Sequence, residues 1–139
     1  MTVAKPIKSH SQIFLSCSRA DRVLAKKIAA ELQKSGLKVV RLQRLESGNE
    51  DSLRYALSKS AAMVAVHSRH TDVPASLLFE IGAMYGSEKP VFVIVDRPNM
   101  KLPFSVSNLR VIAKNRIEQI AEELLSYSQH GSRLSEVIH

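Results

Sequence analysis

Apolar and polar residues alternate along the chain in blocks that predict a parallel β-sheet. Five short runs are rich in apolar residues: QIFLS (12–16), LKVVRL (37–42), AAMVAVHS (61–68), PVFVIVD (90–96) and, more weakly, LRVIA (109–113). Nearly uninterrupted apolar runs of this length are typical of parallel strands that are covered on both faces. We therefore expect a sheet with helices packed on both sides.

Between these runs, apolar residues recur at the spacing of a helix. Three stripes of this kind are Leu24, Ile28 and Leu32, then Leu53, Ala56 and Leu57, and finally Ile117, Ile120, Ala121, Leu124 and Leu125. Another helix is expected to start near Pro74 and to run to about Ser87, and Gly36 is suited to ending the first helix. Because strands alternate with helices, we predict a three-layer, flavodoxin-like α/β fold with five parallel strands in the order 2-1-3-4-5.

Length and composition refine this picture. The 139 residues are one domain's length, and we divide them into a flexible leader (1–11), the domain (12–130) and a polar tail or the start of a linker (131–139). The single Cys builds no disulfide framework, the first residues carry no apolar signal segment, and no apolar run approaches the length of a membrane span. These features predict a cytoplasmic protein without membrane contact.

The formal net charge of +7 leaves several kinds of partner open. Basic residues are concentrated in DRVLAKKIAAELQKSGLK (21–38), where a solvated helix face is the favoured interpretation. An acidic ligand or an acidic partner surface remains an alternative. Direct nucleic-acid binding is not expected, because no basic stripe is interleaved with aromatic residues. His67 and His70 lack further ligands nearby, so no metal site is predicted.

Glu80 interrupts the apolar run SLLFEIGAMYGSEKPVFVIVD (76–96). A carboxylate near a core is costly unless something satisfies or uses it. In doubly wound sheets, ligands bind beyond the carboxyl ends of the strands where the strand order reverses. Here that point lies between the first and third strands, where the loops SCSRAD (16–21) and HSRHTD (67–72) meet, and Glu80 follows the second loop. A structural glutamate, salt-bridged or hydrogen-bonded at a helix edge, is the alternative.

The absence of an obvious second acid beside Glu80 narrows the possible chemistry. Hydrolysis of an ordinary O-glycoside usually requires two carboxylates. An N-glycosidic bond to nicotinamide differs, because the leaving group is already a pyridinium and departs neutral. One carboxylate that positions the ribose hydroxyls and stabilises the developing oxocarbenium charge would then suffice.

Several motifs together resemble the TIR (Toll/interleukin-1 receptor) domain of the bacterial, NAD-cleaving kind. Those that match are Ser16 and Asp21 around the first strand end, Gly48 in the loop after the second strand, and Glu80, Gly82, Lys89 and Pro90 before the fourth strand. The chain departs from the family at Cys17, Ser47 and Ser76, where an aromatic residue, Pro and Trp are often found. The resemblance implies that Glu80 is the catalytic residue and that NAD+ is a substrate, with no cofactor needed.

The residues that we expect to bind substrate surround the same strand ends: Ser16, Cys17, Ser18, Asp21, Arg44, Gly48, Ser68 and Ser76. For Ser18, simple helix capping with Asp21 is the preferred interpretation. Cys17 is interpreted as a small residue at a strand end rather than a nucleophile. Asp96 either faces the cleft or caps its loop, and Arg41 leads into the loop after the second strand.

The resemblance also implies partners. In the family, the loop after the second strand (the BB loop, Arg44–Asp51 here) contacts a neighbouring subunit, and bacterial members are often effectors of anti-phage immunity that a sensor activates through assembly. We therefore expect self-association through this loop and a sensor domain or partner protein. Two alternatives remain open: a non-catalytic adaptor that signals by self-association, and a nucleoside deoxyribosyltransferase-like enzyme.

Overall fold

A computed structural model describes residues 7–8, 10–41, 50–68, 74–96 and 108–127. Its elements follow one another as β1 (Gln12–Cys17), the 3-10 turn η1 (Arg19–Asp21), α1 (Arg22–Lys34), β2 (Lys38–Val40), α2 (Glu50–Lys59), β3 (Ala62–Val66), α3 (Ala75–Gly86), β4 (Val91–Val95), β5 (Leu109–Ala113), η2 (Lys114–Gln119) and α4 (Ile120–Ser126). All strand pairs are parallel and the sheet order is β2-β1-β3-β4-β5. The predicted fold class and strand order are confirmed.

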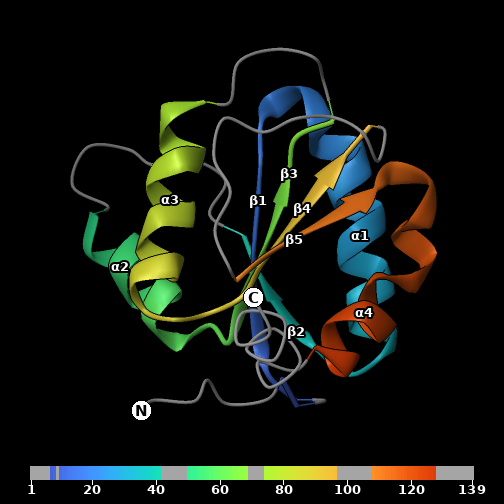
Figure 1. Cartoon of the computed structure of the whole chain (residues 1–139), viewed down its shortest axis with the longest axis horizontal. Helices are drawn as coiled ribbons and strands as arrows, with labels where there is room; N and C mark the ends of the chain where they lie inside the picture. Colours follow the sequence, from blue (N-terminus) through green and yellow to red (C-terminus); the bar gives the residue numbers. More distant parts are fainter. Residues whose placement is uncertain (1–6, 9, 42–49, 69–73, 97–107, 128–139) are drawn as a thin grey trace, which may run out of the picture.

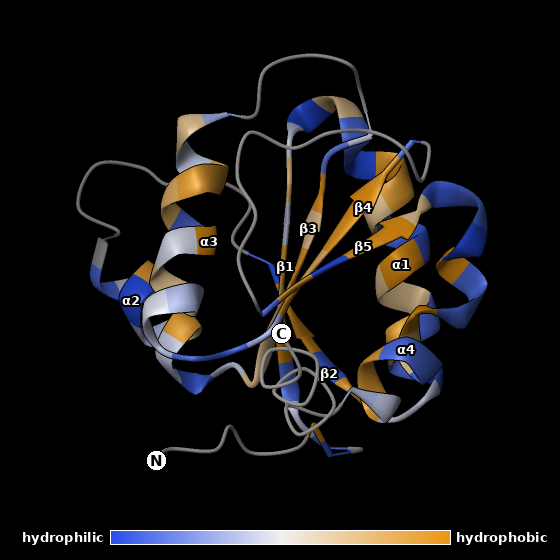
Figure 2. Cartoon of the chain, viewed as in Figure 1, coloured by the Kyte–Doolittle hydropathy of each residue, from blue (hydrophilic) through white to orange (hydrophobic). Residues whose placement is uncertain are grey.

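The sheet separates two layers of helices. Figure 1 shows α1 and α4 on one side of the strands and α2 and α3 on the other. Side chains alternate along β1, so that Ile13 and Leu15 join the core under α1 and α4 while Phe14 joins the core under α2 and α3. Figure 2 shows the strands β3 and β4 as mostly apolar, as expected for strands buried on both faces. This alternation decides which layer each residue at a strand end faces.

Two expected elements differ in detail from the structure. The second strand is shorter than the run 37–42, since β2 spans only Lys38–Val40. The last stripe is wrong at one position: Leu125 is exposed, while Ile120, Ala121 and Leu124 form the buried face. Ile117 lies in η2, whose 3-10 turns have about three residues each, and this shifts the register of the α4 stripe. Within the described residues, no helix has both the length and the apolar character that a membrane crossing requires.

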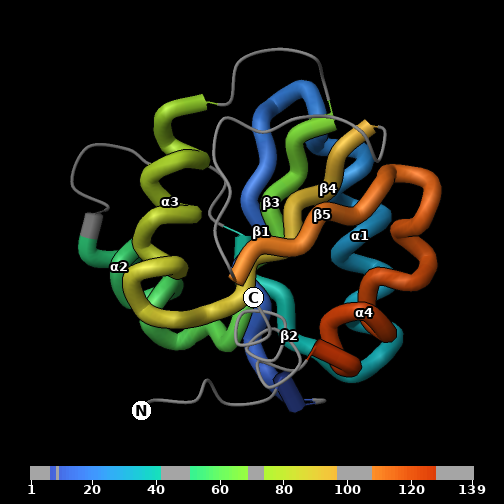
Figure 3. Tube along the Cα trace, viewed as in Figure 1, coloured from blue at the N-terminus to red at the C-terminus, as the bar shows by residue number. Residues whose placement is uncertain are grey.

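The carboxyl ends of β1, β3 and β4 lie side by side at the top of the view in Figure 3. The pairing register sets Ser16 opposite Ala65 and Cys17 opposite Val66, and the His67 amide continues the ladder by donating to the Ile94 carbonyl at 2.9 Å. The strand order reverses beside β1, with β2 on one flank and β3 on the other. The predicted reversal of the strand order beside β1 is therefore present in the fold.

Helices α1 and α3 end in the same hydrogen-bonded motif but with different residues. At the end of α1, Gly36 has φ 86°, and the Gly36 and Leu37 amides donate to the Gln33 and Leu32 carbonyls. At the end of α3, Glu88 has φ 59°, and its amide donates to the Tyr85 carbonyl. Gly36 therefore confirms the predicted helix end, whereas Glu88 occupies a left-handed conformation that favours glycine.

Replacing Glu88 with glycine is expected to stabilise the fold. Removal of the Cβ relieves a left-handed conformation that costs about 1–2 kcal/mol for an L-residue, partly offset by the greater entropy of glycine in the unfolded chain. We expect the free energy of unfolding to rise by about 1 kcal/mol, measured by urea denaturation. Gly36→Ala, where φ is also positive, is the matched opposite change and should lower it by a similar amount. Destabilisation by Glu88→Gly would contradict this account of the α3 terminus.

Candidate functional site

Glu80 and Ser16 meet at the carboxyl end of β1. Ser16 follows Phe14 by two residues, so its side chain faces the α2 and α3 layer. Glu80 lies on the face of α3 that is buried, at the helical spacing of Leu77, Ile81 and Met84. The Ser16 hydroxyl donates to Glu80 Oε1 at 2.6 Å, and only 6% of Glu80 is exposed. The small side chain of Ala65, which pairs with Ser16 on β3, fits beside this contact.

Burial controls the electrostatics of this carboxyl group. Desolvation raises the pKa of Glu80, and the hydrogen bond from Ser16 opposes the shift by favouring the charged form. Among the described residues, no cation forms an ion pair with Glu80. A structural Glu80 was expected to form either a salt bridge or a hydrogen bond. The described residues show the hydrogen bond and no salt bridge. Because Ser16 donates to Oε1, the other oxygen of the Glu80 carboxylate, Oε2, can accept a hydrogen bond from a ligand hydroxyl.

Asp21 joins the loops that follow β1 and β3. It is 4% exposed and accepts from the Ser68 amide at 3.3 Å, from the Ser68 hydroxyl in a short hydrogen bond, and from the Ser18 hydroxyl at 3.3 Å. The expected helix capping by Ser18 and Asp21 is wrong, since neither side chain makes a capping hydrogen bond at the start of η1 or α1. The Asp21 carboxylate is buried, and its hydrogen bonds hold the two loops together.

The remaining predicted residues are distributed around these two clusters. Cys17 faces the opposite layer from Ser16, against the core under α1 and α4, and burial raises the pKa of its thiol, which does not favour a nucleophilic thiolate. Ser76 is exposed in the first turn of α3, one turn before Glu80. Asp96 forms an ion pair with Lys114 at 3.2 Å. The structure therefore connects Ser16 with Glu80, and Ser18 and Ser68 with Asp21. Among the described residues, no side-chain hydrogen bond joins Cys17 or Ser76 to either group.

Four residues named from the sequence lie outside the described residues: Arg44, Ser47, Gly48 and His70. Most of the loop Arg44–Asp51 lies outside them as well. His67 is described and is buried at 4% exposure. Within the described part of the chain, no three His, Cys, Asp or Glu side chains are grouped to hold a metal ion.

Lys89 has a role that its sequence position does not reveal. Its ammonium donates to the Leu57 and Ser58 carbonyls at 3.0 and 2.9 Å, which satisfies carbonyl groups at the end of α2, and desolvation lowers the pKa of this lysine. The residue links α2 to the start of β4, at the end of the sheet opposite Glu80. The presence of lysine at this motif position is therefore explained by its hydrogen bonds to α2. Lys89 itself makes no described hydrogen bond to Glu80 or Ser16.

Comparison with known proteins identifies both a sequence family and structural neighbours. A family model described as TIR domain matches residues 13–125. Among solved structures, the CMP N-glycosidase BcmB from Clostridium botulinum superposes with a TM-score of 0.58 at 16% identity, covering 81% of this chain and 97% of the other. The sugar isomerase domain of an RpiR transcription factor from Sphaerobacter thermophilus gives 0.60 at 12% identity, covering 93% and 79%.

A diflavin flavoprotein A3 from Nostoc sp. gives a TM-score of 0.51 at 16% identity, covering 93% of this chain and 99% of the other. Among curated proteins, none matches the sequence. At these identities the structural neighbours establish the shared α/β fold and nothing further, whereas the family match covers most of the chain.

Proposed function

Because the chain belongs to the TIR domain family, we propose that it cleaves the bond between nicotinamide and ribose in NAD+, with Glu80 as the catalytic carboxylate. The single observation that carries this proposal is the placement of Glu80. A desolvated carboxylate, held by Ser16, lies at the carboxyl end of β1 where the strand order reverses. NAD+ is the substrate, and the reaction requires no cofactor.

The proposed reaction uses charge stabilisation rather than proton transfer to the leaving group. As the bond between C1′ of the ribose and the pyridinium nitrogen breaks, its electron pair goes to nicotinamide, which leaves neutral. The ribose becomes an oxocarbenium ion, and the Glu80 carboxylate stabilises this developing charge in a site with little water. Water then adds to C1′ and loses a proton, which gives ADP-ribose. Attack by the adenine end instead gives a cyclic product.

The two clusters have different roles in this proposal. Ser16 orients Glu80, so that Oε2 is directed to the ribose hydroxyls. Asp21 fixes the loop after β3 against the loop after β1, which supports the crevice wall. The hydroxyl of Ser18 and backbone amides beside it are proposed to contact the ribose or phosphate. Arg44 and Gly48, which we propose to contact the substrate from the BB loop, lie outside the described residues.

A panel of substrates distinguishes the candidate activities. Purified protein is incubated separately with NAD+, with CMP and with a deoxynucleoside plus an acceptor base, and the released bases are separated by chromatography. CMP is included because the Clostridium botulinum neighbour is a CMP N-glycosidase. Nicotinamide release alone is expected. Release of cytosine alone would identify CMP as the substrate instead of NAD+. Exchange of the deoxynucleoside base alone would identify the deoxynucleoside as the substrate. No release by a chain that self-associates would favour the non-catalytic adaptor.

The pH dependence of cleavage should reveal the protonation state of Glu80. If the carboxylate is the active form, kcat falls as the pH falls through the raised pKa of Glu80, above the range of an ordinary glutamate. Ser16→Ala removes the hydrogen bond that favours the charged form, so the acid limb should move to higher pH, and the loss of activity should be larger in acid than at alkaline pH. Ser16→Thr keeps a hydroxyl and should restore the profile. An equal loss at every pH would contradict this role of Ser16.

The family also suggests a biological setting for the reaction. We propose that the chain acts as an effector module of bacterial anti-phage immunity, with a sensor domain or partner protein that drives its assembly. Contact through the BB loop would complete the crevice from a neighbouring subunit, so that the competent state is rarely populated in the monomer. Specific activity that rises with protein concentration would support this proposal, and constant specific activity would oppose it.

A further inference from the structure

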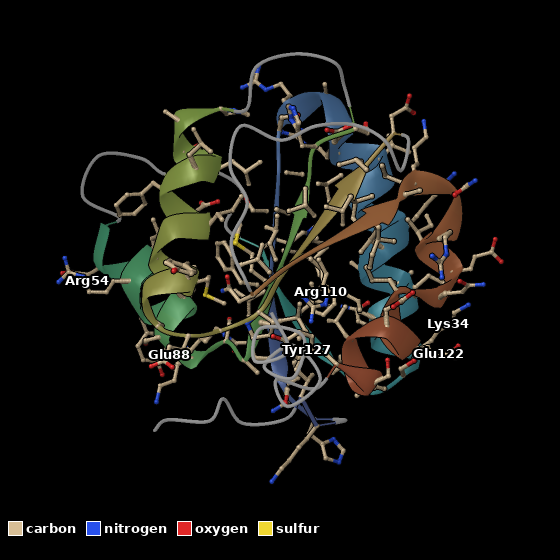
Figure 4. All side chains as sticks on the ribbon, in the orientation of Figure 1. Lys34, Arg54, Glu88, Arg110, Glu122 and Tyr127 are labelled. Atoms are coloured by element: carbon tan, nitrogen blue, oxygen red, sulfur yellow. The ribbon has the colours of Figure 1, made fainter. Side chains whose placement is uncertain are left out.

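His67 is a buried imidazole that directly follows β3, with 4% of the residue exposed. Figure 4 shows the charged side chains of Lys34 and Glu122 on the outside of the helix layer, where both residues are exposed. In the described part of the chain, the polar or charged residues that are buried are Asp21, Ser60, His67 and Glu80. Burial of an imidazole costs free energy unless a partner or a ligand satisfies its nitrogens. A structural contact or a ligand must therefore offset the cost at this position.

The hydrogen-bond ladder places the His67 side chain on the α2 and α3 side of the sheet. The Met63 amide donates to the Pro90 carbonyl at 3.1 Å, and the His67 amide donates to the Ile94 carbonyl at 2.9 Å. His67 therefore continues the β3 ladder in register, and side chains that are two residues apart on a strand face the same side. Met63 and Ala65 belong to the core under α2 and α3. The imidazole consequently faces the same layer.

The same register places His67 one step beyond the level of Glu80. Ser16, which donates to Glu80, is paired with Ala65 on β3. His67 follows Ala65 by two residues, about 6.6 Å further toward the carboxyl edge of the sheet. Figure 1 shows α3 running in the opposite direction to β3, so Leu77 lies about 4.5 Å nearer this edge than Glu80. The imidazole therefore lies on the Glu80 side of the sheet, nearer to the edge where substrate is proposed to bind.

We propose that His67 is the base that accepts a proton from the water that attacks C1′ after nicotinamide has left. This inference rests on the NAD+ cleavage proposed above. In that reaction, the bond to nicotinamide breaks without proton transfer, but the attacking water must lose a proton as its oxygen bonds to C1′. The proton goes to a ring nitrogen of neutral His67, which becomes an imidazolium and returns the proton to solvent when ADP-ribose leaves.

Two separate groups suit the two halves of the reaction. The negative charge of Glu80 stabilises the oxocarbenium ion until water has added, and the hydrogen bond from Ser16 favours this charged form. If Glu80 took the proton itself, the carboxylate would lose its charge during the step. A neutral imidazole avoids this loss, because it carries one donor nitrogen and one acceptor nitrogen. A hydrogen bond at one ring nitrogen fixes the tautomer, and the other nitrogen then accepts from water.

A competing nucleophile separates water addition from bond cleavage. Acetylpyridine, a free pyridine base, attacks C1′ through a nitrogen lone pair and has no proton to lose, so its addition needs no base. When acetylpyridine and water compete, the ratio of exchanged dinucleotide to ADP-ribose measures how well water is activated. Total nicotinamide release measures the cleavage step that requires Glu80. Both products come from the same folded molecules, so the ratio does not depend on the fraction of a variant that folds.

His67→Gln and His67→Asn are compared with the wild type at fixed concentrations of NAD+ and acetylpyridine, and the products are separated by chromatography. Val95→Ala is the matched control, because it removes buried side-chain atoms next to His67 in the continued register without removing a base. We expect the ratio of exchanged dinucleotide to ADP-ribose to rise by at least about tenfold in both His67 variants and to keep its wild-type value in Val95→Ala. In D2O the wild-type ratio should also rise, because only water addition transfers a proton.

The outcomes distinguish this role from a structural one and from failure of NAD+ cleavage itself. If both products fall together in the His67 variants and the ratio is unchanged, His67 is a structural residue and the proposal is overturned. A wild-type ratio that is the same in D2O overturns it as well, even if neither variant folds. Either result leaves NAD+ cleavage standing as long as the wild type releases nicotinamide. If the wild type releases none, NAD+ cleavage is wrong, and this role of His67 is wrong with it.

Discussion

Replacing Glu80 with glutamine is expected to lower the rate of NAD+ cleavage by about 10²-fold or more without unfolding the chain. Glutamine has the same shape and keeps an oxygen that accepts from Ser16, but it carries no negative charge to stabilise an oxocarbenium ion. Nicotinamide release by the two proteins at equal concentration measures the effect. Glu122→Gln on exposed α4 makes the same chemical change far from the site and should keep full activity.

The same substitution should leave the melting temperature unchanged or raise it at neutral pH. Burial raises the pKa of Glu80 in the folded chain, so the charged form at neutral pH is a cost to folding that glutamine removes. As the pH falls through this raised pKa, the wild type binds a proton in the folded state and recovers the stability. The advantage of the variant should therefore shrink in acid. Loss of activity that is accompanied by a large fall in melting temperature would indicate that Glu80 has a structural role instead.

Asp21→Ala should cause the largest loss of stability among the site substitutions. It leaves the partly buried Ser68 amide and two hydroxyl groups without their acceptor, and we expect the free energy of unfolding to fall by about 3 kcal/mol. Ser18→Ala removes only one long hydrogen bond of 3.3 Å and should cost about 0.5–1 kcal/mol. Urea denaturation of both variants provides the comparison.

A double-mutant cycle separates the contact between Asp21 and Ser68 from general disruption. We expect a coupling energy of at least about 1 kcal/mol between Asp21→Ala and Ser68→Ala, because the two residues share a direct hydrogen bond. Cleavage by the folded fraction should fall as well, since the loop after β3 is no longer fixed to the loop after β1. If the two stability effects are additive and turnover is unchanged, Asp21 does not support the site by holding the two loops together.

The sequence allowed the main features of the fold and the position of Glu80 to be predicted, because both depend on local periodicity. Nearly continuous apolar runs identified the strands, and alternation with helices determined the parallel sheet. Glu80 could be recognised because it occupies a core position of a helical stripe beside the point where the strand order reverses. Ser16 could be assigned to the same end of the sheet by its place in β1.

The contacts between distant segments were not predictable in the same way. Asp21 lies 47 residues before Ser68, and its distance from Ser18 suggested a helix cap instead of a link between two loops. Lys89 resembled a motif residue, but its partners are carbonyl groups of α2, which a sequence pattern does not display. The exposure of apolar residues on the outer side of α3 was not predictable either, because these residues are indistinguishable in sequence from those of its buried face.

The release of free nicotinamide from NAD+ by concentrated purified protein, followed by chromatography over time, directly tests whether this chain cleaves NAD+ through Glu80. The test is run across a range of protein concentrations and with a fused assembly tag, beside Glu80→Gln from a parallel preparation. We expect the wild type to release more than one nicotinamide per chain, and Glu80→Gln to be slower by about 10²-fold or more. No release above the rate without protein under any of these conditions, or equal release by Glu80→Gln, would contradict it.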